Sequence, residues 1–389
     1  MRIQHIITRM ILGGAQENTL LSCVGQLEAG DEVELVTGPA RGPEGELLEE
    51  ARKRGVPVRL VPSLRRAIGV RDFFAYRALR RAIREYRPEV VHTHSSKAGV
   101  LGRLAARREG VPAVVHTIHG LPFHPYESGW RNRLYIRAER RAADACDRLV
   151  SVADAMTEQA VAAGVAPREK FTTVYSGMDT KTFLEAPHLR GEMRVHLGLA
   201  PDDLVAVTVA RLFHLKGHAY VVEAAPELCA RFPNLRFLFV GDGVLRRRFQ
   251  ARVRALRLAD RFVFAGLVPS REVPAYLAAA DLVVHPSLRE GLARALPQGM
   301  LAGLPAVSFD VDGAREVVRD GETGYLVPPR DVARLTTAVA RLAQDPDARV
   351  RLGARGRELC RARFDWRVMV RSLRAIYMEC LAGKRVAGS

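Results

Sequence analysis

The sequence is poor in lysine, cysteine and aromatic residues, and each shortage narrows the class of protein. Only six of the 60 basic residues are lysines, so the formal net charge of +17 is carried almost entirely by arginine. So skewed a ratio is consistent with a coding bias of the source genome and does not by itself indicate a binding surface. Five scattered cysteines without a CxxC pair argue against a disulfide framework or a zinc ribbon. Aromatic residues make up 6% of the chain and no RNP, KH or helix-turn-helix pattern occurs, so nucleic-acid binding would depend on charge alone.

Long apolar runs are also missing. No window approaches the ~20 apolar residues of a membrane span, and the first residues lack the apolar stretch of a signal peptide. We therefore expect a cytoplasmic protein whose membrane contact, where it has one, is peripheral. At roughly 100–200 residues per domain, the 389 residues indicate two or three domains.

Short apolar runs alternate with amphipathic stretches along the whole chain, which indicates parallel βα units and an α/β fold. The predicted strands are 3–7, 32–36, 58–61, 90–93, 113–117 and 148–152, then 204–210, 235–240, 261–264, 282–285, 306–309 and 324–327. The rhythm pauses across residues 175–200, which are rich in glycine and proline. We predict one domain at 1–185 and a second at 195–364, with a C-terminal helix at about 365–383 packing back onto or near the first.

Glycines and cations follow several of these strands. Gly13-Gly14 lies between the first strand and a predicted helix, where main-chain N–H groups can bind an anion or simply form a turn. Neither GxGxxG nor GxxxxGK[ST] is present, which removes the main support for a nicotinamide site or a P-loop. Arg211 and Lys216 follow the strand at 204–210, where both can converge on a diphosphate.

A further strand-end feature lies about 75 residues later. Glu290 and Gly291 follow the strand at 282–285 and precede a predicted helix at 292–302. Open α/β sheets bind ligands at the carboxyl ends of their strands. Together these features indicate a site for a nucleotide diphosphate and its sugar.

Six motifs in order along the chain carry a family resemblance. They are Gly13-Gly-Ala-Gln16, His116-Thr-Ile-His-Gly120, Arg211 with Lys216-Gly217, Val240-Gly-Asp-Gly243, Glu290-Gly291 with Gln298, and Val311-Asp-Gly-Ala-Arg-Glu316. With these motifs the chain resembles the family 4 retaining glycosyltransferases over essentially its whole length. The resemblance implies the GT-B fold, in which two Rossmann-like doubly wound parallel-sheet domains face a central cleft, the N-terminal one for the acceptor and the C-terminal one for the nucleotide-sugar donor.

The resemblance also implies roles for individual residues. The implied catalytic residues are Arg211 and Lys216 on the diphosphate, Glu290 on the donor sugar and His119 near the reacting carbon. The implied nucleotide-sugar contacts are Gly13, Gly14, Gly241, Leu267, Val268, Gly291, Leu292 and Gln298. A UDP- or GDP-sugar would be the donor and a lipid-linked or oligosaccharide chain the acceptor, in cell-envelope or exopolysaccharide synthesis. No cofactor or metal is implied.

One position departs from the family pattern. The family usually shows Glu-x7-Glu, whereas here Glu290 is followed by Gln298. The second Glu normally accepts hydrogen bonds from the two ribose hydroxyls. A Gln accepts one and donates another but loses the charge-assisted part, roughly 1 kcal/mol or more. We expect nucleotide binding to be weakened or rearranged rather than abolished.

Two metal readings compete with this interpretation. Asp310-Val-Asp312 matches the DxD pattern of another glycosyltransferase class, but it ends a strand and runs into the family motif at Gly313. His92 and His94 share one strand face and could join His116 and His119 in a zinc cluster. No well-placed carboxylate or cysteine accompanies these histidines, and we expect no metal at either place.

A basic segment runs from Arg65 to Arg87 and contains eight arginines but only two acidic residues, Asp72 and Glu85. Aromatic and aliphatic residues are interleaved at near-helical spacing. The pattern is typical of an interfacial helix on an anionic membrane and equally of an amphipathic helix with a solvated basic face. Membrane docking through this segment is a hypothesis that flotation with liposomes tests.

Other functions fit parts of the sequence. A sugar-nucleotide 2-epimerase or a glycogen-type synthase would share the GT-B motifs, and a binding protein that has lost catalysis would fit the Gln298 substitution. A basic nucleic-acid-binding protein would fit only the charge. An epimerase needs no acceptor, so its reaction with the donor alone distinguishes it from a transferase.

Overall fold

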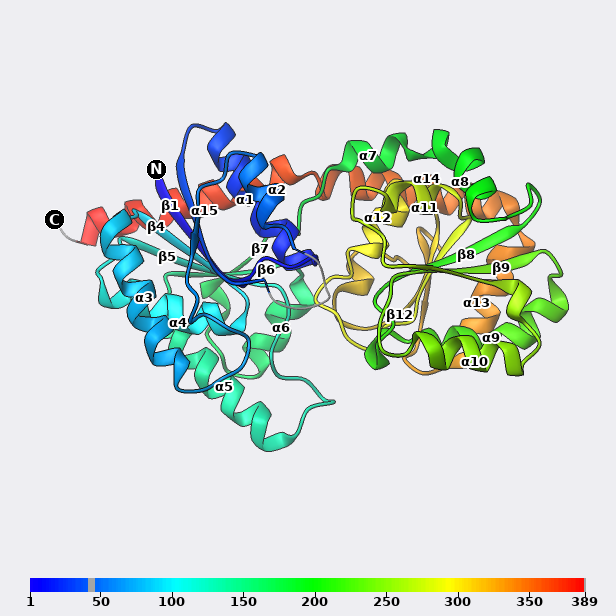
Figure 1. The fold of residues 1–389 in the computed structure, drawn as a ribbon, viewed down its shortest axis with the longest axis horizontal. Coiled ribbons are helices and arrows are strands. Elements are labelled where there is room, and N and C mark those ends of the chain that lie inside the picture. The colour runs from blue at the N-terminus through cyan, green and yellow to red at the C-terminus, as the bar shows by residue number, and fades with distance from the viewer. Residues whose placement is uncertain (41–45, 388–389) are drawn as a thin grey trace. The chain divides into compact units, whose positions relative to one another are not determined.

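The computed structural model describes residues 1–40 and 46–387 and divides the chain into two compact α/β units (Figure 1). The first comprises Met1–Met178 with the C-terminal segment from Asp365, and the second comprises Asp179–Phe364. The change falls inside the stretch at 175–200. Residues 179–185, which the sequence led us to place in the first domain, belong to the second unit.

The first unit contains a seven-stranded parallel sheet in the order β3-β2-β1-β4-β5-β6-β7. Its strands are β1 (Arg2–Arg9), β2 (Glu32–Gly38), β3 (Val58–Leu60), β4 (Val90–His94), β5 (Ala113–Ile118), β6 (Arg148–Ser151) and β7 (Phe171–Thr173). The inner strands are buried on both faces, as in β4, because helices cover both sides of a parallel sheet. We missed β7 because its sequence, Phe171-Thr-Thr, contains a single apolar residue and so gives no apolar run.

Helices form two layers on this sheet. They are α1 (Gly14–Glu28), α2 (Leu48–Lys53), α3 (Arg71–Tyr86), α4 (Ser96–Arg108), α5 (Gly129–Asp144), α6 (Asp154–Ala162) and α15 (Trp366–Ala387). One apolar core joins α3 and α4 to one face, while α1, α2 and α15 pack on the other (Figure 1). The last helix of the chain therefore covers the N-terminal sheet, with Trp366 and Tyr377 buried against it.

The second unit contains a six-stranded parallel sheet in the order β10-β9-β8-β11-β12-β13. Its strands are β8 (Leu204–Val209), β9 (Leu235–Val240), β10 (Phe262–Gly266), β11 (Leu282–His285), β12 (Ala306–Phe309) and β13 (Gly324–Val327). Its helices are α7 (Thr180–Glu185), α8 (Arg190–His196), α9 (His218–Arg231), α10 (Arg246–Ala255), α11 (Val273–Ala278), α12 (Ala295–Leu301), α13 (Val332–Gln344) and α14 (Pro346–Arg363). The main core joins α9, α10 and α13 to one face, while Gly299 of α12 packs against Val283 on the other.

Residues 175–200, where the strand and helix rhythm pauses and where we placed the domain boundary, contain the short helices α7 and α8. Arg194 of α8 is buried and donates hydrogen bonds to the carbonyl oxygens of Ala279 and Asp203 at 3.1 and 2.9 Å and to the Asp281 carboxylate at 2.9 Å. This anchor lies far along the chain from α8. Local composition could not reveal it, which is why the pause in the pattern looked like a linker.

Strand order reverses direction once in each sheet, between β1 and β4 and between β8 and β11. Such switch points separate the loops that leave the two neighbouring strands and create the crevice in which open α/β sheets bind ligands. Among the helices of residues 1–40 and 46–387, none is both long and apolar enough to cross a membrane.

Candidate active site

In the second unit, the loops that leave β8 and β11 meet at the switch point. The Leu288 N–H donates to the Leu215 carbonyl at 2.9 Å, and the Ser287 hydroxyl donates to the same oxygen at 3.0 Å. Gly217 has a φ of 74°, and a Cβ there would lie 1.8 Å from the Pro286 carbonyl oxygen. Only glycine fits this position, because both its φ and the close backbone approach exclude a side chain.

This loop pairing brings Lys216 and Glu290 together. The Lys216 ammonium forms an ion pair with the Glu290 carboxylate, and His285 Nε2 lies 3.4 Å from the same carboxylate. Burial alone would raise the pKa of Glu290, but Lys216 and His285 outweigh it and hold the pKa well below the usual value. The Glu290 N–H also donates to Asp312 at 2.6 Å, so carboxylate and main chain are both fixed.

Arg211 lies in the same loop but in a different environment. Its exposed guanidinium stacks over the Phe213 ring, 5.0 Å from the ring centroid. Within the described residues it forms no ion pair with a carboxylate and no hydrogen bond to Lys216 or Glu290. The two cations predicted to converge therefore differ: the Arg211 guanidinium is exposed, whereas the Lys216 ammonium is paired with the Glu290 carboxylate.

The remaining predicted contacts in this unit surround the same loops. Gly241 has a φ of 139°, and a Cβ there would lie 2.2 Å from the Ala210 carbonyl oxygen, next to Arg211. Its N–H donates to the Gly266 carbonyl at 2.8 Å, which brings the end of β9 to the end of β10. Leu267, the next residue, is 55% exposed and offers an apolar surface where a base was predicted. Val268 is half-buried.

On the other side of the switch point, the Gly291 carbonyl accepts from the Gly313 N–H at 3.0 Å. Leu292 is buried, so that only its main chain is available to a ligand. Gln298 is half-buried on α12, which begins at Ala295 rather than at Leu292 as predicted. No contact in the structure tests the role predicted for the Gln298 side chain.

The DxD reading is not favoured by the geometry. Arg315 binds both carboxylate oxygens of Asp310 at 3.0 and 2.7 Å, and Asp312 accepts from the Glu290 N–H. Asp312 adopts a φ of 47°, which is rare for a residue with a side chain and places its carboxylate against that N–H. Both carboxylates serve protein partners, and Asp312 acts in holding the Glu290 loop.

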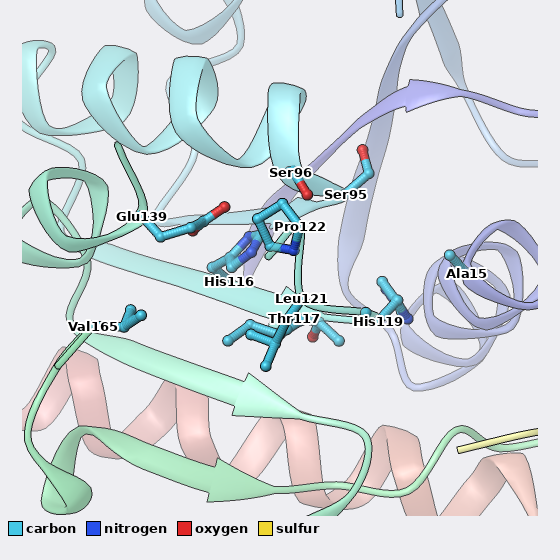
Figure 2. Close-up of a pocket in the computed structure, with 12 residues that line it drawn as sticks. Ala15, Ser95, Ser96, His116, Thr117, His119, Leu121, Pro122, Glu139 and Val165 are labelled. Carbon is cyan, nitrogen blue, oxygen red and sulfur yellow. The ribbon is translucent and has the colours of Figure 1, made fainter. Parts of the chain in front are cut away.

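In the first unit, a pocket of about 230 Å³ opens at the carboxyl ends of β4 and β5 (Figure 2). His119, which follows β5, lies on its wall, and Figure 2 shows it toward Ala15 at the start of α1. Ser95 and Ser96, at the start of α4, line it as well. Ser95 adopts a φ of 59°, and its hydroxyl lies 2.8 Å from that of Thr8. Strain of this kind recurs at functional sites.

Gly13 and Gly14, the glycine pair singled out from the sequence, come directly before Ala15, which lines this pocket. α1 begins at Gly14, and Gly13 has an extended φ of 172° that any residue adopts. A Cβ on Gly13 would contact only the Gln16 side chain, which can move. The backbone therefore does not require glycine at Gly13. Like the sequence, the structure fits both a phosphate contact and a simple turn at this position.

The histidines predicted as an alternative zinc cluster separate into two groups. In the described part of the chain, His116 Nδ1 lies 2.9 Å from the Thr93 hydroxyl and the ring is bonded to no other histidine. His94, in contrast, joins two other rings: its Nδ1 lies 3.1 Å from His119 Nε2 and its Nε2 lies 2.9 Å from His5 Nδ1. In the part of the chain that the structure describes, one group of residues could hold a metal ion, namely His5, His92 and His94, all buried. His5 was not among the predicted residues.

Two functional candidates were missed from the sequence. His285 was read as the end of a strand, although its position five residues before Glu290 on a strand end was a usable signal. Glu139, which lines the first unit's pocket, forms a buried ion pair with Arg103, with 2.6 Å between Oε2 and Nη2. Arg103 and Glu139 are 36 positions apart in the chain, so no local pattern indicated their contact.

Solved structures with a similar fold cover nearly the whole chain. Anabaena HepE, solved in complex with UDP and glucose, superposes with a TM-score of 0.83 at 20% identity, covering 97% of this chain and 99% of that one. The lipopolysaccharide outer core galactosyltransferase WaaB superposes with a TM-score of 0.70 at 16% identity, covering 97% of this chain and 100% of that one. The two parallel-sheet units thus have the GT-B fold of glycosyltransferases.

Sequence comparison then gives the family. Residues 12–182 match the family described as Glycosyltransferase Family 4, and residues 190–359 match Glycosyl transferases group 1. A GDP-mannose-dependent alpha-(1-6)-phosphatidylinositol monomannoside mannosyltransferase of Mycolicibacterium smegmatis is 30% identical over 96% of both chains. A UDP-Gal:alpha-D-GlcNAc-diphosphoundecaprenol alpha-1,3-galactosyltransferase of Escherichia coli is 28% identical over 88% of both. The chain belongs to the group 1, family 4 type glycosyltransferases, and it is a transferase.

Proposed function

We propose that this protein is a retaining, metal-independent glycosyltransferase that moves a sugar from a UDP- or GDP-sugar to a lipid-linked or polysaccharide acceptor in cell-envelope or exopolysaccharide synthesis. The observation that carries the proposal is the Lys216–Glu290–His285 cluster at the switch point of the second unit. Departure of the nucleoside diphosphate is the difficult step, and fixed cations and amides stabilise the leaving group. Relatives with lipid-linked acceptors in their names support the acceptor class.

The mechanism assigns opposite charges to neighbouring groups. Lys216 exchanges its contact with Glu290 for the diphosphate when the donor binds, and Arg211 adds a second cation. Glu290, kept ionised by a lowered pKa, then accepts hydrogen bonds from the sugar hydroxyls. The acceptor hydroxyl attacks from the side of the leaving group, which retains the anomeric configuration, and the phosphate takes its proton.

Screening UDP- and GDP-sugars by thermal shift identifies the donor. A true donor at about 100 times its Kd stabilises the protein by about 2.7 kcal/mol, which corresponds to a rise in Tm of roughly 5 °C or more. That donor is then incubated with diphosphopolyprenol-linked acceptors in the presence of EDTA, and the product's anomeric configuration is read by NMR. An inverted product, loss of transfer in EDTA, or epimerisation of the donor without acceptor would overturn the corresponding part of the proposal.

We further propose that the protein works at the cytoplasmic face of the membrane and docks there through the N-terminal end of α3. Phe73 and Phe74 are each 60% exposed, and Ile68 and Val70, just before the helix, are 77% and 84% exposed. Apolar side chains beside many arginines fit an anionic bilayer surface. The opposite face of α3 packs on the sheet through residues such as Leu79.

The ion pairs along α3 identify which arginines matter. Arg80 and Arg84 face Glu109, and Arg81 faces Glu85, so these charges are partly compensated within the protein. Arg71 and Arg77 have no carboxylate partner within the described residues, and Arg77 lies over the Phe73 ring, 5.7 Å from its centroid. The membrane contact is therefore centred on the first turns of α3 rather than spread over residues 65–87.

Replacing Phe73 and Phe74 together by serine lowers affinity for vesicles containing anionic lipid at least tenfold, because each Phe buries apolar area worth about 1.5–3 kcal/mol when fully inserted. Flotation with phosphatidylglycerol vesicles measures this. Val350→Ser, which removes a residue 72% exposed on α14, is the matched control. The docking surface would be refuted if the double variant floated as well as wild type. It would also be refuted if wild type bound neutral vesicles as well as anionic ones.

A further inference from the structure

A chain of hydrogen bonds runs through the interior of the first unit and ends at the pocket. Gln26 Oε1 of α1 lies 2.7 Å from His5 Nε2, His5 Nδ1 lies 2.9 Å from His94 Nε2, and His94 Nδ1 lies 3.1 Å from His119 Nε2. Gln26, His5 and His94 are fully buried. Of these four, only His119 lines the pocket.

The sheet itself places these rings in line. His5 of β1 is the register partner of His92 on β4, and His94 is two residues further along the same strand. Alternate residues of a strand share one face, so all three histidines point toward α1 and α15. His119 follows the carboxyl end of β5, the neighbour of β4, and meets the exposed end of this row.

Neutral imidazole has one N–H and one lone pair, which makes the row directional. Burial lowers the pKa of His5 to about 4 and that of His94 well below its ordinary value, so both rings are neutral at physiological pH. An amide oxygen only accepts, so His5 donates from Nε2 to Gln26. His5 Nδ1 must then accept from His94 Nε2–H, and His94 Nδ1 must accept from His119 Nε2–H.

A second branch of hydrogen bonds leaves the Gln26 amide from its nitrogen. Its Nε2 donates to the Tyr377 hydroxyl of α15 at 3.2 Å. The Tyr377 hydroxyl in turn lies 2.5 Å from His92 Nδ1, and His92 Nε2 lies 2.7 Å from the Thr117 hydroxyl. Tyr377 accepts from the amide and donates to His92, so this branch agrees with an amide whose oxygen faces His5.

We propose that Gln26, His5 and His94 form a relay that fixes the tautomer of His119, with the proton on Nε2 and the lone pair on Nδ1. Gln26, His5 and His94 are positioning residues, because they act only through His119. The consequence for catalysis rests on the proposed function together with the position that the family resemblance implies for His119, near the reacting carbon. The fixed tautomer then determines whether His119 has a lone pair or an N–H at Nδ1.

The hydrogen bonds of His5, His92 and His94 compete with metal binding, because a ring that uses both of its nitrogens in hydrogen bonds has none left for a metal ion. His5, His92 and His94 offer ligand atoms within 4.8 Å of one another. Each of the three uses both ring nitrogens toward Gln26, Tyr377, Thr117 or another ring of the row. The relay therefore predicts protein without bound metal, and a stoichiometric zinc content lost on His5→Asn substitution would overturn it.

Histidine tautomers are read directly by two-bond ¹H–¹⁵N NMR on the full-length, ligand-free protein with ¹⁵N-labelled histidine, using His119→Gln to assign the signals. Wild type should show a protonated Nε2 and an unprotonated Nδ1 at His119. His94→Leu removes the acceptor and should give a mixture of tautomers. His94→Gln keeps an oxygen that accepts from His119 and an amide that donates to His5, and should restore the wild-type signals.

Kinetics provide the second readout. His94→Leu should lower kcat at least tenfold with the donor KM within about threefold of wild type, as expected for loss of a partner that orients a reacting group, and His94→Gln should recover most of this loss. Cys23→Ala, which opens a cavity one turn before Gln26 on α1, controls for destabilisation and should leave the tautomer unchanged.

The outcomes separate the two proposals. If wild type transfers sugar and His94→Leu changes neither tautomer nor kcat, the relay is wrong. A wild-type His119 with its proton on Nδ1 also overturns it. If wild type shows the stated tautomer but transfers sugar from none of the donors, the relay is supported and the proposed function fails.

Discussion

Replacing Lys216 by alanine should lower kcat by about 10²–10³-fold, the usual effect of removing one preorganised charge donor from a site that stabilises a leaving group. Lys216 lies at the switch point where the loops after β8 and β11 are hydrogen-bonded to each other, so its main chain is held in place next to the Leu215 carbonyl. The loss should appear mainly in kcat, because charge on the diphosphate increases as the glycosidic bond breaks. Steady-state kinetics with the donor identified by thermal shift measure it.

The ion pair to Glu290 creates a second effect that has to be separated from the first. Removing Lys216 leaves the Glu290 carboxylate with His285 at 3.4 Å and raises the pKa that Lys216 holds down. A double variant, Lys216→Ala with Glu290→Gln, removes the uncompensated charge. If Lys216→Ala lowers kcat by the same factor in the Glu290→Gln background as in the wild-type background, the defect comes from the missing cation.

Lys181→Ala is the matched control for Lys216→Ala. Lys181 belongs to α7 of the same unit, its side chain is 78% exposed, and it pairs with Glu185 one turn away. Its removal should leave kcat within experimental error. A Lys216→Ala enzyme with kcat within threefold of wild type would contradict the assignment of this lysine to the leaving group.

The regular elements could be predicted because parallel strands buried on both faces leave a strong local signal. The twelve predicted strands all form, with ends within two residues of the predicted ones, since runs such as Leu204–Val209 are apolar enough to stand out. Beyond β7, the main failure was the stretch with α7 and α8. There Arg194 binds the Ala279 carbonyl and the Asp281 carboxylate, both more than 80 residues away, and no local pattern contains that information.

The candidate site was predictable as a set of positions but not as a set of contacts. Strand-end location singled out Arg211, Lys216 and Glu290. The sequence could not tell that Lys216 pairs with Glu290 while Arg211 stays open, because this depends on how two loops 70 residues apart pack. The buried row that joins His5 to His119 depends in the same way on strand register across three segments.

Acidification should destabilise the first unit steeply between pH 6.5 and 4. Burial lowers the pKa of His5 to about 4 and those of His92, His94 and His116 well below 6.5, with neighbouring histidines, and Arg103 for His116, adding to the effect. The unfolded chain binds protons at these residues near pH 6.5, whereas the folded chain does not. Stability is therefore complete above pH 6.5 and falls as pH decreases.

Each such histidine contributes a slope of about 1.4 kcal/mol per pH unit, so four give roughly 5 kcal/mol per unit near pH 5, comparable with the entire stability of many domains. The chain's two tryptophans, Trp130 and Trp366, both belong to the first unit, so urea unfolding followed by tryptophan fluorescence reports on this unit within the full-length protein. His116→Gln should reduce the slope by about one quarter, and Cys23→Ala, which alters a buried residue of the same unit without removing a histidine, should not. Equal urea midpoints at pH 7.5 and pH 5 would show that these histidines are not kept neutral by the fold.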